Sequence, residues 1–513
     1  MRRRGPRRAW AVRGAAALVA AVAPMAGCTP ADAPTTGGPQ AAGRCQPLAR
    51  SEPARARNVV FVLSDTMRRD RMGIHGSAAR TPRYDAFARE GLWFTAATAP
   101  APWTKPSVAT LFTGLRPSTH GVLSHPALRP DSEPVATDAL GDAQSTLAEA
   151  LAAAGYQTAA FVANPWVQRA LGFAQGFEVW DESLADVSTP GEAVTEAGLR
   201  WLRERPRDDR PYFLYLHYVD AHEPFWPVPP DRLAERRAAI EADARPVSRF
   251  AGAAIARLVH GADGEQLADQ GVEANRALFE LAYDVGVEHF DRALGSLLDG
   301  VAALSDAGDP AIVVTSDHGE SLFERGWRSH GRGLYEEETG VPLAARLPGV
   351  ATRGPIACPV GLIDLGATLC DYLGVSCPGG GQGTSLFSPS LADPERVLRV
   401  EGVMERDRNR AVRGPRYKLI YEPDGGPGHG GSQEVRPFRL YDMDADPGER
   451  HDLLAGDPDD ASSAALARLR REAEAPAEVS APADSVVLDR ETVHRLQAMG
   501  YLQAPDEAAG AGR

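Results

Sequence analysis

The sequence predicts an α/β protein built on a large, mostly parallel, doubly wound sheet, followed by a smaller C-terminal subdomain. Three observations support this fold class. Short apolar runs end abruptly in polar residues, segments with helical spacing separate these runs, and the alternation stops after about Arg396. Continuous apolar runs are typical of parallel strands buried on both faces, and strands that alternate with helices indicate a sheet covered by helices on both sides.

The strongest strand candidates all lead directly into residues that carry chemistry. They are residues 58–63 before Asp65, residues 212–216 before His217 and His222, and residues 311–314 before Asp317 and His318. Ligands of doubly wound sheets bind beyond the carboxyl ends of the strands. We therefore expect Asp65, His222, Asp317 and His318 to meet at one edge of the sheet.

The remaining elements follow from local signals. Thr146 and Glu149 match a capping box that opens a helix ending near Gly155, and residues 158–162 then read as a strand. Residues 278–298 have apolar side chains at helical spacing. In the C-terminal part we expect a strand pair at 413–421, a strand at 440–442, a closing helix at 462–473 and a short helix at 492–502.

The N-terminus has the features of a secretion signal. Six arginines lie within the first 13 residues, an apolar stretch follows at 14–23, and the segment closes in Ala26-Gly27-Cys28. The apolar stretch is too short to span a bilayer. A Cys after Ala-Gly resembles a bacterial lipobox, which predicts lipidation of Cys28 and attachment to the cell envelope, at the outer membrane or the periplasmic face. An ordinary signal peptide with a coincidental Cys is the alternative.

Composition sets further expectations for the mature protein. Residues 29–55 are rich in Ala, Pro, Gly and Thr, which favours a flexible tether, and residues 505–513 are expected to form a disordered tail. Four cysteines remain after Cys28, namely Cys45, Cys358, Cys370 and Cys377, and of their three possible pairings Cys370 with Cys377 is the most local. The net charge of −14 and the lack of a basic run outside the leader exclude nucleic acid as an expected partner.

A series of short motifs resembles the sulfatase branch of the alkaline-phosphatase superfamily. In chain order these are Asp65 with Thr66, Arg68 and Asp70; Thr81-Pro82; residues 103–114; His222-Glu223-Pro224; residues 316–320; residues 334–337; and residues 341–343. The resemblance implies an alkaline-phosphatase-like catalytic domain over residues 56–395. It also implies a C-terminal subdomain over residues 396–504 with an antiparallel sheet and a helix.

Thr104 stands where sulfatases carry the Cys or Ser that is oxidised to formylglycine, the aldehyde whose hydrate attacks the sulfate ester. The same oxidation of a threonine cannot give that aldehyde, because its Cβ carries a methyl group. The Arg that follows in the family signature is Val108 here. The resemblance therefore implies an esterase site whose nucleophile is the threonine hydroxyl itself.

Asp65, Asp317 and His318 carry side chains that can bind one divalent metal ion. Carboxylates suit Mg²⁺, Ca²⁺ or Mn²⁺, and the added imidazole of His318 favours Mn²⁺ or Zn²⁺. The superfamily implies that the nucleophile is itself a ligand, so the expected ligands are Asp65, Thr104, Asp317 and His318. Thr66 and His318 replace an acidic residue and an Asn that are usual in sulfatases, which resembles single-metal phosphoester enzymes of the superfamily.

Other residues have expected roles at the substrate. His222 aligns with a substrate-side His of the family and His330 falls near a later basic position, so both are candidates to give the leaving oxygen a proton. Lys105 is a candidate for binding anionic oxygens, with solvent exposure as the alternative. Asn164 is a candidate to donate a hydrogen bond to an ester oxygen, with a turn before Pro165 as the alternative.

Three functions remain open on the sequence. The favoured one is a metal-dependent phosphoester hydrolase or transferase, because phosphoryl transfer to an alkoxide needs no aldehyde. The second is a sulfatase that acts without formylglycine, and the third is a non-catalytic surface lipoprotein. The expected substrate is an anionic ester, such as a cell-envelope or extracellular polymer, but no motif identifies it. Residues 227–273 form a long insertion whose arginines, Arg232, Arg236, Arg237 and Arg245, either contact that substrate or face solvent.

Overall fold

The computed structural model describes residues 45–498 apart from several gaps. The gaps are residues 56, 125–135, 187, 244–274, 305–308, 379, 405–407, 424–435 and 477–482. The expected signal peptide, most of the expected tether, and the tail at 505–513 lie outside the described residues. Among the described helices, none has the length and the apolarity that crossing a bilayer requires.

A mixed eight-stranded sheet forms the centre of the molecule, in the order β12-β2-β11-β8-β1-β7-β5-β6. Its strands are β1 (Val59–Ser64), β2 (Leu92–Phe94), β5 (Gln157–Val162), β6 (Val179–Asp181), β7 (Tyr212–Tyr218), β8 (Ala311–Ser316), β11 (Leu343–Arg346) and β12 (Gly354–Ile356). The central strands β8, β1, β7 and β5 pair in parallel. Every residue of these four strands is buried, which explains their continuous apolar sequences. The predicted α/β fold is confirmed.

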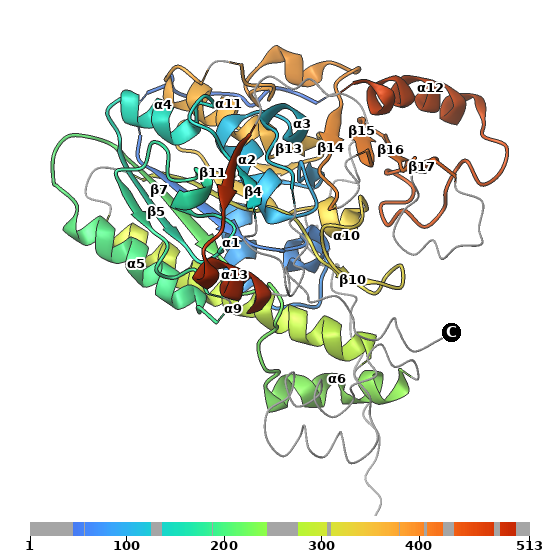
Figure 1. Cartoon of the computed structure of the whole chain (residues 1–513), viewed down its shortest axis with the longest axis horizontal. Helices are drawn as coiled ribbons and strands as arrows, with labels where there is room; N and C mark the ends of the chain where they lie inside the picture. The colour runs from blue at the N-terminus through green and yellow to red at the C-terminus, as the bar shows by residue number, and fades with distance from the viewer. Residues whose placement is uncertain are drawn as a thin grey trace, which may run out of the picture. The chain divides into compact units, whose positions relative to one another are not determined.

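Helices cover both faces of this sheet (Figure 1). One layer contains α1 (Pro82–Glu90), α5 (Gly191–Glu204) and α9 (Arg276–Leu304), and the other contains α2 (Thr104–Thr113), α4 (Leu147–Ala153) and α11 (Ile363–Leu373). The capping box at α4 is confirmed, because the Thr146 side chain accepts a hydrogen bond from the backbone N–H of Glu149 and the Glu149 carboxylate accepts one from the backbone N–H of Thr146.

Further elements connect these layers. They are α3 (Pro117–His120), α6 (Pro230–Ala242), α10 (Glu336–Thr339), β3 (Ala97–Thr98), β9 (Ser321–Leu322), β10 (Arg328–Ser329), β13 (Val360–Gly361) and 3-10 helices at Arg69–Arg71, Gly73–His75, Arg169–Leu171 and Pro389–Ala392. The hairpin of β9 and β10 carries part of the site described below.

The C-terminal subdomain has the expected antiparallel sheet and helix. Its strands are β14 (Leu398–Val400), β15 (Arg410–Arg413), β16 (Tyr417–Tyr421) and β17 (Phe438–Asp442), which pair in chain order. Helix α12 (Asp460–Glu474) packs Leu469 on Val412 and Leu419 on one side of this sheet. The opposite side packs on Leu334 and Tyr335 of the main domain.

Residues 484–498 do not belong to this subdomain, although the sequence suggested that it extends to residue 504. Strand β18 (Asp484–Val487) pairs with β4 (Ala136–Ala139), and α13 (Arg490–Ala498) follows. Leu488 and Leu496 join the core of the main domain. The boundary was placed wrongly because helix α13 carries no sequence signal for which core it covers.

Part of the expected tether is also structured. Leu48 is buried in the main core, Arg50 pairs with Asp371, and Cys45 forms a disulfide with Cys358. The local disulfide between Cys370 and Cys377 is present as well. Residues 45–52 are therefore held on the domain, because a disulfide, a buried Leu and backbone hydrogen bonds to Gly349 outweigh a composition that favours flexibility.

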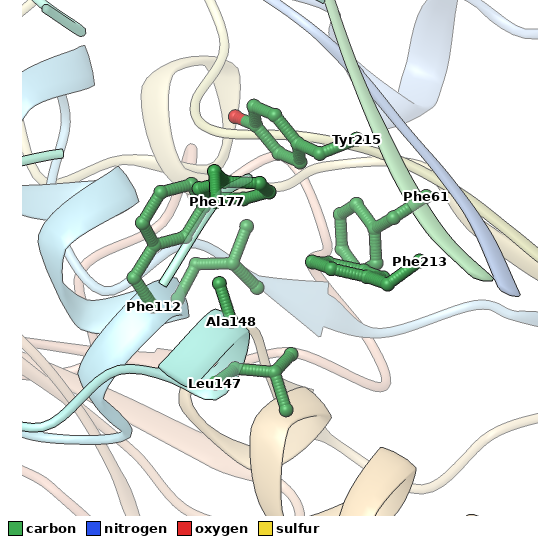
Figure 2. Close-up of a pocket in the computed structure, with 8 residues that line it drawn as sticks. Phe61, Phe112, Leu147, Ala148, Phe177, Phe213 and Tyr215 are labelled. Atoms are coloured by element: carbon green, nitrogen blue, oxygen red, sulfur yellow. The ribbon is translucent and has the colours of Figure 1, made fainter. Parts of the chain in front are cut away.

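A small apolar void lies between the sheet and helices α2 and α4 (Figure 2). It is lined by Phe61, Leu111, Phe112, Leu147, Ala148, Phe177, Phe213 and Tyr215. A binding site combines an apolar wall with a few convergent polar groups, and the Tyr215 hydroxyl is the one polar side-chain group in this lining. The void is a packing gap of the core, separate from the candidate active site.

Candidate active site at the carboxyl edge of the sheet

The ends of four neighbouring strands bring the predicted residues to one place. Ser64, the last residue of β1, lies opposite Ser316 of β8 and Tyr218 of β7. The next residue after Ser64 is Asp65, and the next after Ser316 is Asp317. Because parallel strands end at the same edge, the two carboxylates meet there, as the sequence predicts.

Helix α2 brings Thr104 to this edge from above the sheet. Thr104 is its first residue, and all ten residues of the helix are buried. The Thr104 hydroxyl lies 3.2 Å from Nε2 of His318. A helix N-terminus carries a partial positive charge, which stabilises negative charge that develops on an oxygen at that position.

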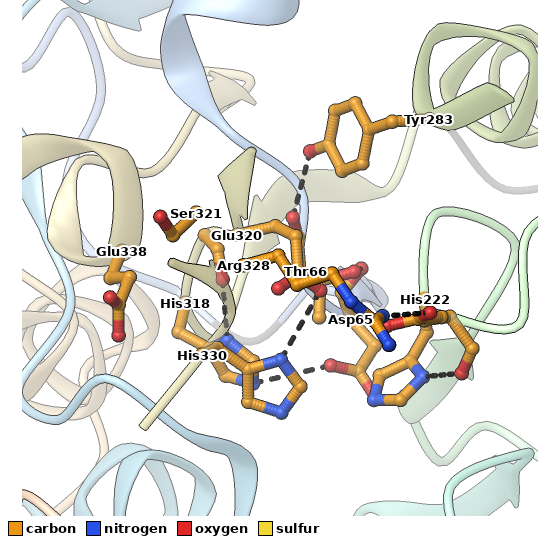
Figure 3. A network of polar contacts seen from close by, with 12 residues as sticks. Asp65, Thr66, His222, Tyr283, His318, Glu320, Ser321, Arg328, His330 and Glu338 are labelled. Carbon is orange, nitrogen blue, oxygen red and sulfur yellow. Dashed lines mark hydrogen bonds and ion pairs between the residues drawn. The ribbon is translucent and has the colours of Figure 1, made fainter. Parts of the chain in front are cut away.

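The four predicted metal ligands thus form one cluster. His318 Nε2 lies 3.3 Å from Asp65 Oδ1 and 3.5 Å from Asp317 Oδ2, in addition to its contact with Thr104. All four residues have an exposed fraction of 0%. The ligand atoms come from three elements, and Figure 3 shows the side chains of Asp65 and His318 side by side.

His217 joins this cluster, and sequence reasoning assigned it no role. One ligand atom each of Asp65, His217 and Asp317 lies within 4.8 Å of the others. The signal was present in the sequence, because His217 is the one imidazole in the otherwise apolar and aromatic run of β7. Its Nδ1 contacts the Tyr215 hydroxyl at 3.2 Å. This contact fixes the ring and leaves Nε2 as the nitrogen that can bind a metal ion.

The residues fit a divalent cation. Asp65 Oδ1, Asp317 Oδ2 and His217 Nε2 are buried atoms without a hydrogen-bond partner among the described residues. Buried polar atoms are normally satisfied, and a group of unsatisfied ligand atoms at one point needs an explanation. Carboxylates together with imidazoles are donors that transition metals accept. The sequence-based preference for Mn²⁺ or Zn²⁺ remains a prediction.

The electrostatics of the cluster agree with that fit. Burial and then the charge of Asp65 raise the pKa of Asp317 to about 7. Burial would lower the pKa of His318, but the carboxylates of Asp317 and Asp65 outweigh it and raise this pKa to about 9. Two carboxylates side by side in a dry site thus attract positive charge, which a bound cation would supply.

The loop after β1 is held in an uncommon backbone conformation. Thr66 has a φ of 58°, in the left-handed region, and its backbone N–H donates to Asp317 Oδ1 at 3.3 Å. The Tyr283 hydroxyl from α9 donates to the Thr66 carbonyl and accepts from the Arg68 N–H, both at 2.8 Å (Figure 3). Tyr283 of α9 therefore fixes the turn directly after Asp65, and this turn donates a hydrogen bond to Asp317.

Asn164 lies inside the cluster rather than at its surface. Its Oδ1 accepts a hydrogen bond from the Trp166 N–H at 2.6 Å, which directs Nδ2 toward the site. Nδ2 donates to Asp65 and lies 3.4 Å from the Thr104 hydroxyl. The side chain makes the turn contact that the sequence offered as one alternative, and a hydrogen bond from Asn164 to an ester oxygen stays a prediction.

His222 and His330 form the next layer outward, with exposed fractions of 4% and 5%. Their ring centroids are 5.1 Å apart, and the centroid of His330 is 4.4 Å from that of His318. His222 Nδ1 contacts the Glu223 carbonyl, and burial lowers the pKa of His222. His330 Nδ1 lies 3.2 Å from Glu320 Oε2. Sequence reasoning gave Glu320 no separate role, although it stands in the motif at 316–320.

Lys105 is not brought to the site. Its ammonium donates to the Ser124 carbonyl at 2.7 Å, the Thr137 hydroxyl at 2.6 Å and the Asp138 carbonyl at 3.1 Å. These three acceptors use its three N–H groups, and burial lowers the pKa of Lys105 to about 7. The side chain following the nucleophile points away from it along the helix, so the expected contact with anionic substrate oxygens is corrected to a structural role.

The long insertion is described only in part. Arg232 of α6 pairs with Glu235 and Glu288, and Arg237 pairs with Glu241. Arg245 lies outside the described residues. The charges of Arg232 and Arg237 are therefore matched by neighbouring carboxylates.

Comparisons with known proteins find relatives that align with most of the chain. An ulvan-active sulfatase of Formosa agariphila is 23% identical over 77% of this chain and 77% of its own. A Δ4,5-hexuronate-2-O-sulfatase of Bacteroides thetaiotaomicron is 24% identical over 78% and 85%. The structure of a phosphonate monoester hydrolase of Agrobacterium radiobacter superposes with a TM-score of 0.58 at 20% identity, covering 81% of this chain and 96% of that one.

The family assignment rests on a broader match. The sequence model of the family named Sulfatase matches residues 57–375, which is more than half of the 513 residues and contains Asp65, Thr104, Asp317 and His318. The chain therefore belongs to the sulfatase family of ester hydrolases.

Proposed function

We propose that this sulfatase-family protein is a metal-dependent phosphoester hydrolase or transferase in which Thr104 is the nucleophile. The observation that carries the proposal is the position of an unmodified threonine hydroxyl, 3.2 Å from His318 and beside Asp65 and Asp317. A threonine hydroxyl attacks phosphorus directly, whereas the sulfatase route through an aldehyde hydrate is closed to it.

Asp65, Asp317 and His318, with Thr104 and His217 beside them, would hold the cation. When bound, a divalent cation lowers the pKa of a hydroxyl group and offsets negative charge on the ester oxygens. The chain's own residues supply the rest of the environment. The N-terminus of α2 faces the Thr104 oxygen, and the amide of Asn164 orients it. Complete burial of the cluster excludes water from these interactions.

With the cation bound, Thr104 would act as an alkoxide, its hydroxyl proton having been released to solvent when the cation binds. The transfer forms a bond between Thr104 Oγ1 and phosphorus and breaks the bond to the leaving oxygen. That oxygen needs a proton, and His222 and His330 stand in the layer through which it departs. The Glu320 carboxyl fixes the His330 ring through Nδ1, so the Nε2 edge faces away from Glu320. Water or a second hydroxyl then attacks phosphorus, frees Thr104, and returns a proton to the same histidines.

A sulfate ester reaction without formylglycine is the second candidate. The names of the relatives favour it, because both curated relatives named above are sulfatases and both names refer to a carbohydrate. The threonine side chain opposes it, because a sulfo-threonine would have to be cleared by water without the elimination that an aldehyde hydrate permits. An anionic polymer of the envelope or the extracellular space remains our proposal for the substrate.

A matched assay distinguishes the two reactions. Aryl phosphate monoesters and diesters, an aryl phosphonate and an aryl sulfate are tested with Mn²⁺, Zn²⁺, Mg²⁺ and Ca²⁺, with Thr104→Ala as the control. We expect phosphoester or phosphonate turnover above sulfate turnover. Sulfate hydrolysis that clearly exceeds the other rates would reverse the assignment, and no turnover of any ester would favour a non-catalytic lipoprotein.

We also propose that the protein is anchored through lipidated Cys28, which lies outside the described residues. The basic and apolar leader that ends in Ala26-Gly27-Cys28 supports this. Cys28→Ser should release a soluble form or block processing. Intact-mass measurement of the membrane fraction tests it, and the lack of an acyl mass on Cys28 would contradict it.

A further inference from the structure

The reacting groups lie beneath two rings and an outer ion pair. Asp65, Thr104 and Asp317 are fully buried, and above them His222 and His330 are almost fully buried. Each of these two histidines lies close in sequence to a charged residue. Glu223 follows His222 directly, and Arg328 precedes His330 by two positions.

Arg328 and Glu223 form an ion pair that joins the segment of His222 to the β9–β10 hairpin. Their side chains are 42% and 30% exposed, so they lie further out than either histidine. The Arg328 guanidinium also lies 5.6 Å from the centre of the Phe279 ring. Figure 3 shows the Arg328 side chain extending toward the His222 segment.

The pair is close to the inner groups as well as to solvent. Burial and then the charge of Glu223 raise the pKa of Glu320, while Arg328 acts in the opposite direction. Glu320 contacts His330, which in turn stacks near His318. Both members of the outer pair therefore act electrostatically on the layer next to the reacting groups.

Other cations close to the site are held by protein acceptors. Lys105 donates to three oxygens away from the site. Arg68 pairs with Asp70 and Glu324 and also donates to the Glu320 carbonyl. Arg328 differs because its own side chain is 42% exposed, whereas that of Arg68 is 4% exposed. Exposed ion pairs contribute little free energy, so a competing anion can replace Glu223 at low cost.

We propose that Arg328 is a specificity-determining residue that binds a second anionic group of the substrate, outside the reacting ester, in exchange for Glu223. This inference rests on the proposed function and names its substrate class as esters that carry an additional negative charge. Glu223 acts as the internal competitor that occupies Arg328 until such a substrate arrives. The net charge of −14 makes a local cation necessary for attracting an anionic substrate.

The test compares two ligands that differ only in charge. 3-Carboxyphenylphosphonate and 3-carbamoylphenylphosphonate are titrated into the metal-loaded protein by calorimetry, and the ratio of the two Kd values is measured. For Arg328→Gln we expect the preference for the carboxylate ligand to fall at least tenfold. For Glu223→Gln we expect it to rise severalfold, and the double variant should show a ratio near one.

Opposite signs for the two partners are the decisive result. If the ion pair only held the two segments together, both single variants would change affinity in the same direction and for both ligands. That outcome, or unchanged ratios, would overturn the inference. Arg203→Gln and Glu196→Gln break a comparably exposed pair on α5 and should leave both affinities unchanged. Thermal unfolding of every variant checks that the fold is intact.

A parallel pair separates this inference from the proposed function. 3-Carboxybenzenesulfonate and 3-carbamoylbenzenesulfonate are titrated in the same way. Binding of the sulfonates alone would reject the phosphoester assignment while the Kd ratios still decide the role of Arg328. Binding of neither pair to the metal-loaded protein would reject both.

Discussion

Two clusters of buried charge in this molecule are organised in opposite ways. At the carboxyl edge of the main sheet, ligand atoms of Asp65, Asp317 and His217 lie within 4.8 Å of one another, and the two carboxylates share the imidazole of His318. Between the main domain and the C-terminal sheet, by contrast, the buried ammonium of Lys418 has a partner on every side. It lies 3.0 Å from Glu336, 2.9 Å from Glu449 and 3.2 Å from the Thr339 hydroxyl.

The second cluster, which we call the Lys418 network, joins three segments of the chain. Lys418 is on β16, Glu336 is on α10, and Glu449 follows β17. Glu336 also pairs with Arg69 at 2.6 Å, and the Glu336 backbone N–H donates to Glu449 at 2.6 Å. Negative and positive groups thus neutralise one another inside the protein.

The comparison shows how a buried charge cluster that stabilises the fold can be distinguished from one that binds a ligand. Burial of a charge is costly unless the charge is paired, so a network that pairs its own charges holds the fold together. Two adjacent buried carboxylates that share one imidazole keep an excess of negative charge, which lowers stability, and a protein retains such a cluster where it binds a cation. The two clusters should therefore respond to substitution in opposite directions.

The largest effect should come from the nucleophile. Thr104→Ala removes the attacking oxygen, and we expect kcat to fall by about 10³-fold or more, because the remaining rate reflects binding and electrostatics alone. Thr104→Ser is the matched control and should retain activity to within about tenfold. Steady-state kinetics on the best ester measure both. Full activity in Thr104→Ala would remove Thr104 from the mechanism.

Asp317→Asn should separate binding from stability. The substitution keeps an oxygen to accept from Thr66 and His318 but removes a charge beside Asp65. We expect metal binding to be nearly abolished, as measured by elemental analysis of the purified protein. Urea unfolding of the metal-free protein should show a gain of about 1–2 kcal/mol, because the repulsion between two buried carboxylates is relieved. A marked loss of stability would contradict the contrast between the clusters.

Lys418→Met should have the opposite effect. It leaves Glu336 and Glu449 buried without their shared cation, and breaking a buried pair costs about 3–5 kcal/mol. Urea unfolding should therefore show a large loss, whereas the metal content of the folded protein should stay at the wild-type level. Loss of metal with unchanged stability would show that the network serves the site rather than the fold.

A smaller, pH-dependent effect should come from Glu338 of α10, next to the Lys418 network. Burial raises the pKa of Glu338 to about 7, although Gly333 N–H and the Trp327 indole donate to its carboxylate. A raised folded-state pKa gives stability below the unfolded pKa of about 4.5 that is lost as the pH rises through about 7. Glu338→Gln mimics the protonated form and should not follow this loss. The difference in unfolding free energy between the two proteins should change by about 1–3 kcal/mol over that range, and a constant difference would contradict the assignment.

The sequence predicted the sheet and most of the site because both depend on local order along the chain. Apolar runs with two buried faces identify parallel strands, and a polar residue directly after such a run must lie at the carboxyl edge. Asp65 directly follows one such run, and Asp317 and His318 directly follow another. Their positions along the chain therefore sufficed to predict that they lie together. Thr104 was identified by its motif, and its chemistry follows from its Cβ methyl group.

Tertiary structure decided the features that depend on direction and on distant partners. Lys105 is held away from the site because its ammonium donates hydrogen bonds to the Ser124 carbonyl and the Thr137 hydroxyl, 19 and 32 residues further along the chain. His217 joins the ligands because β7 lies beside β1, and neither fact is local. Helix α13 packs on the main core because the preceding strand β18 pairs with β4, far back in the sequence. A sequence pattern specifies which residues face inward, but which partner they meet is set by packing between segments hundreds of residues apart.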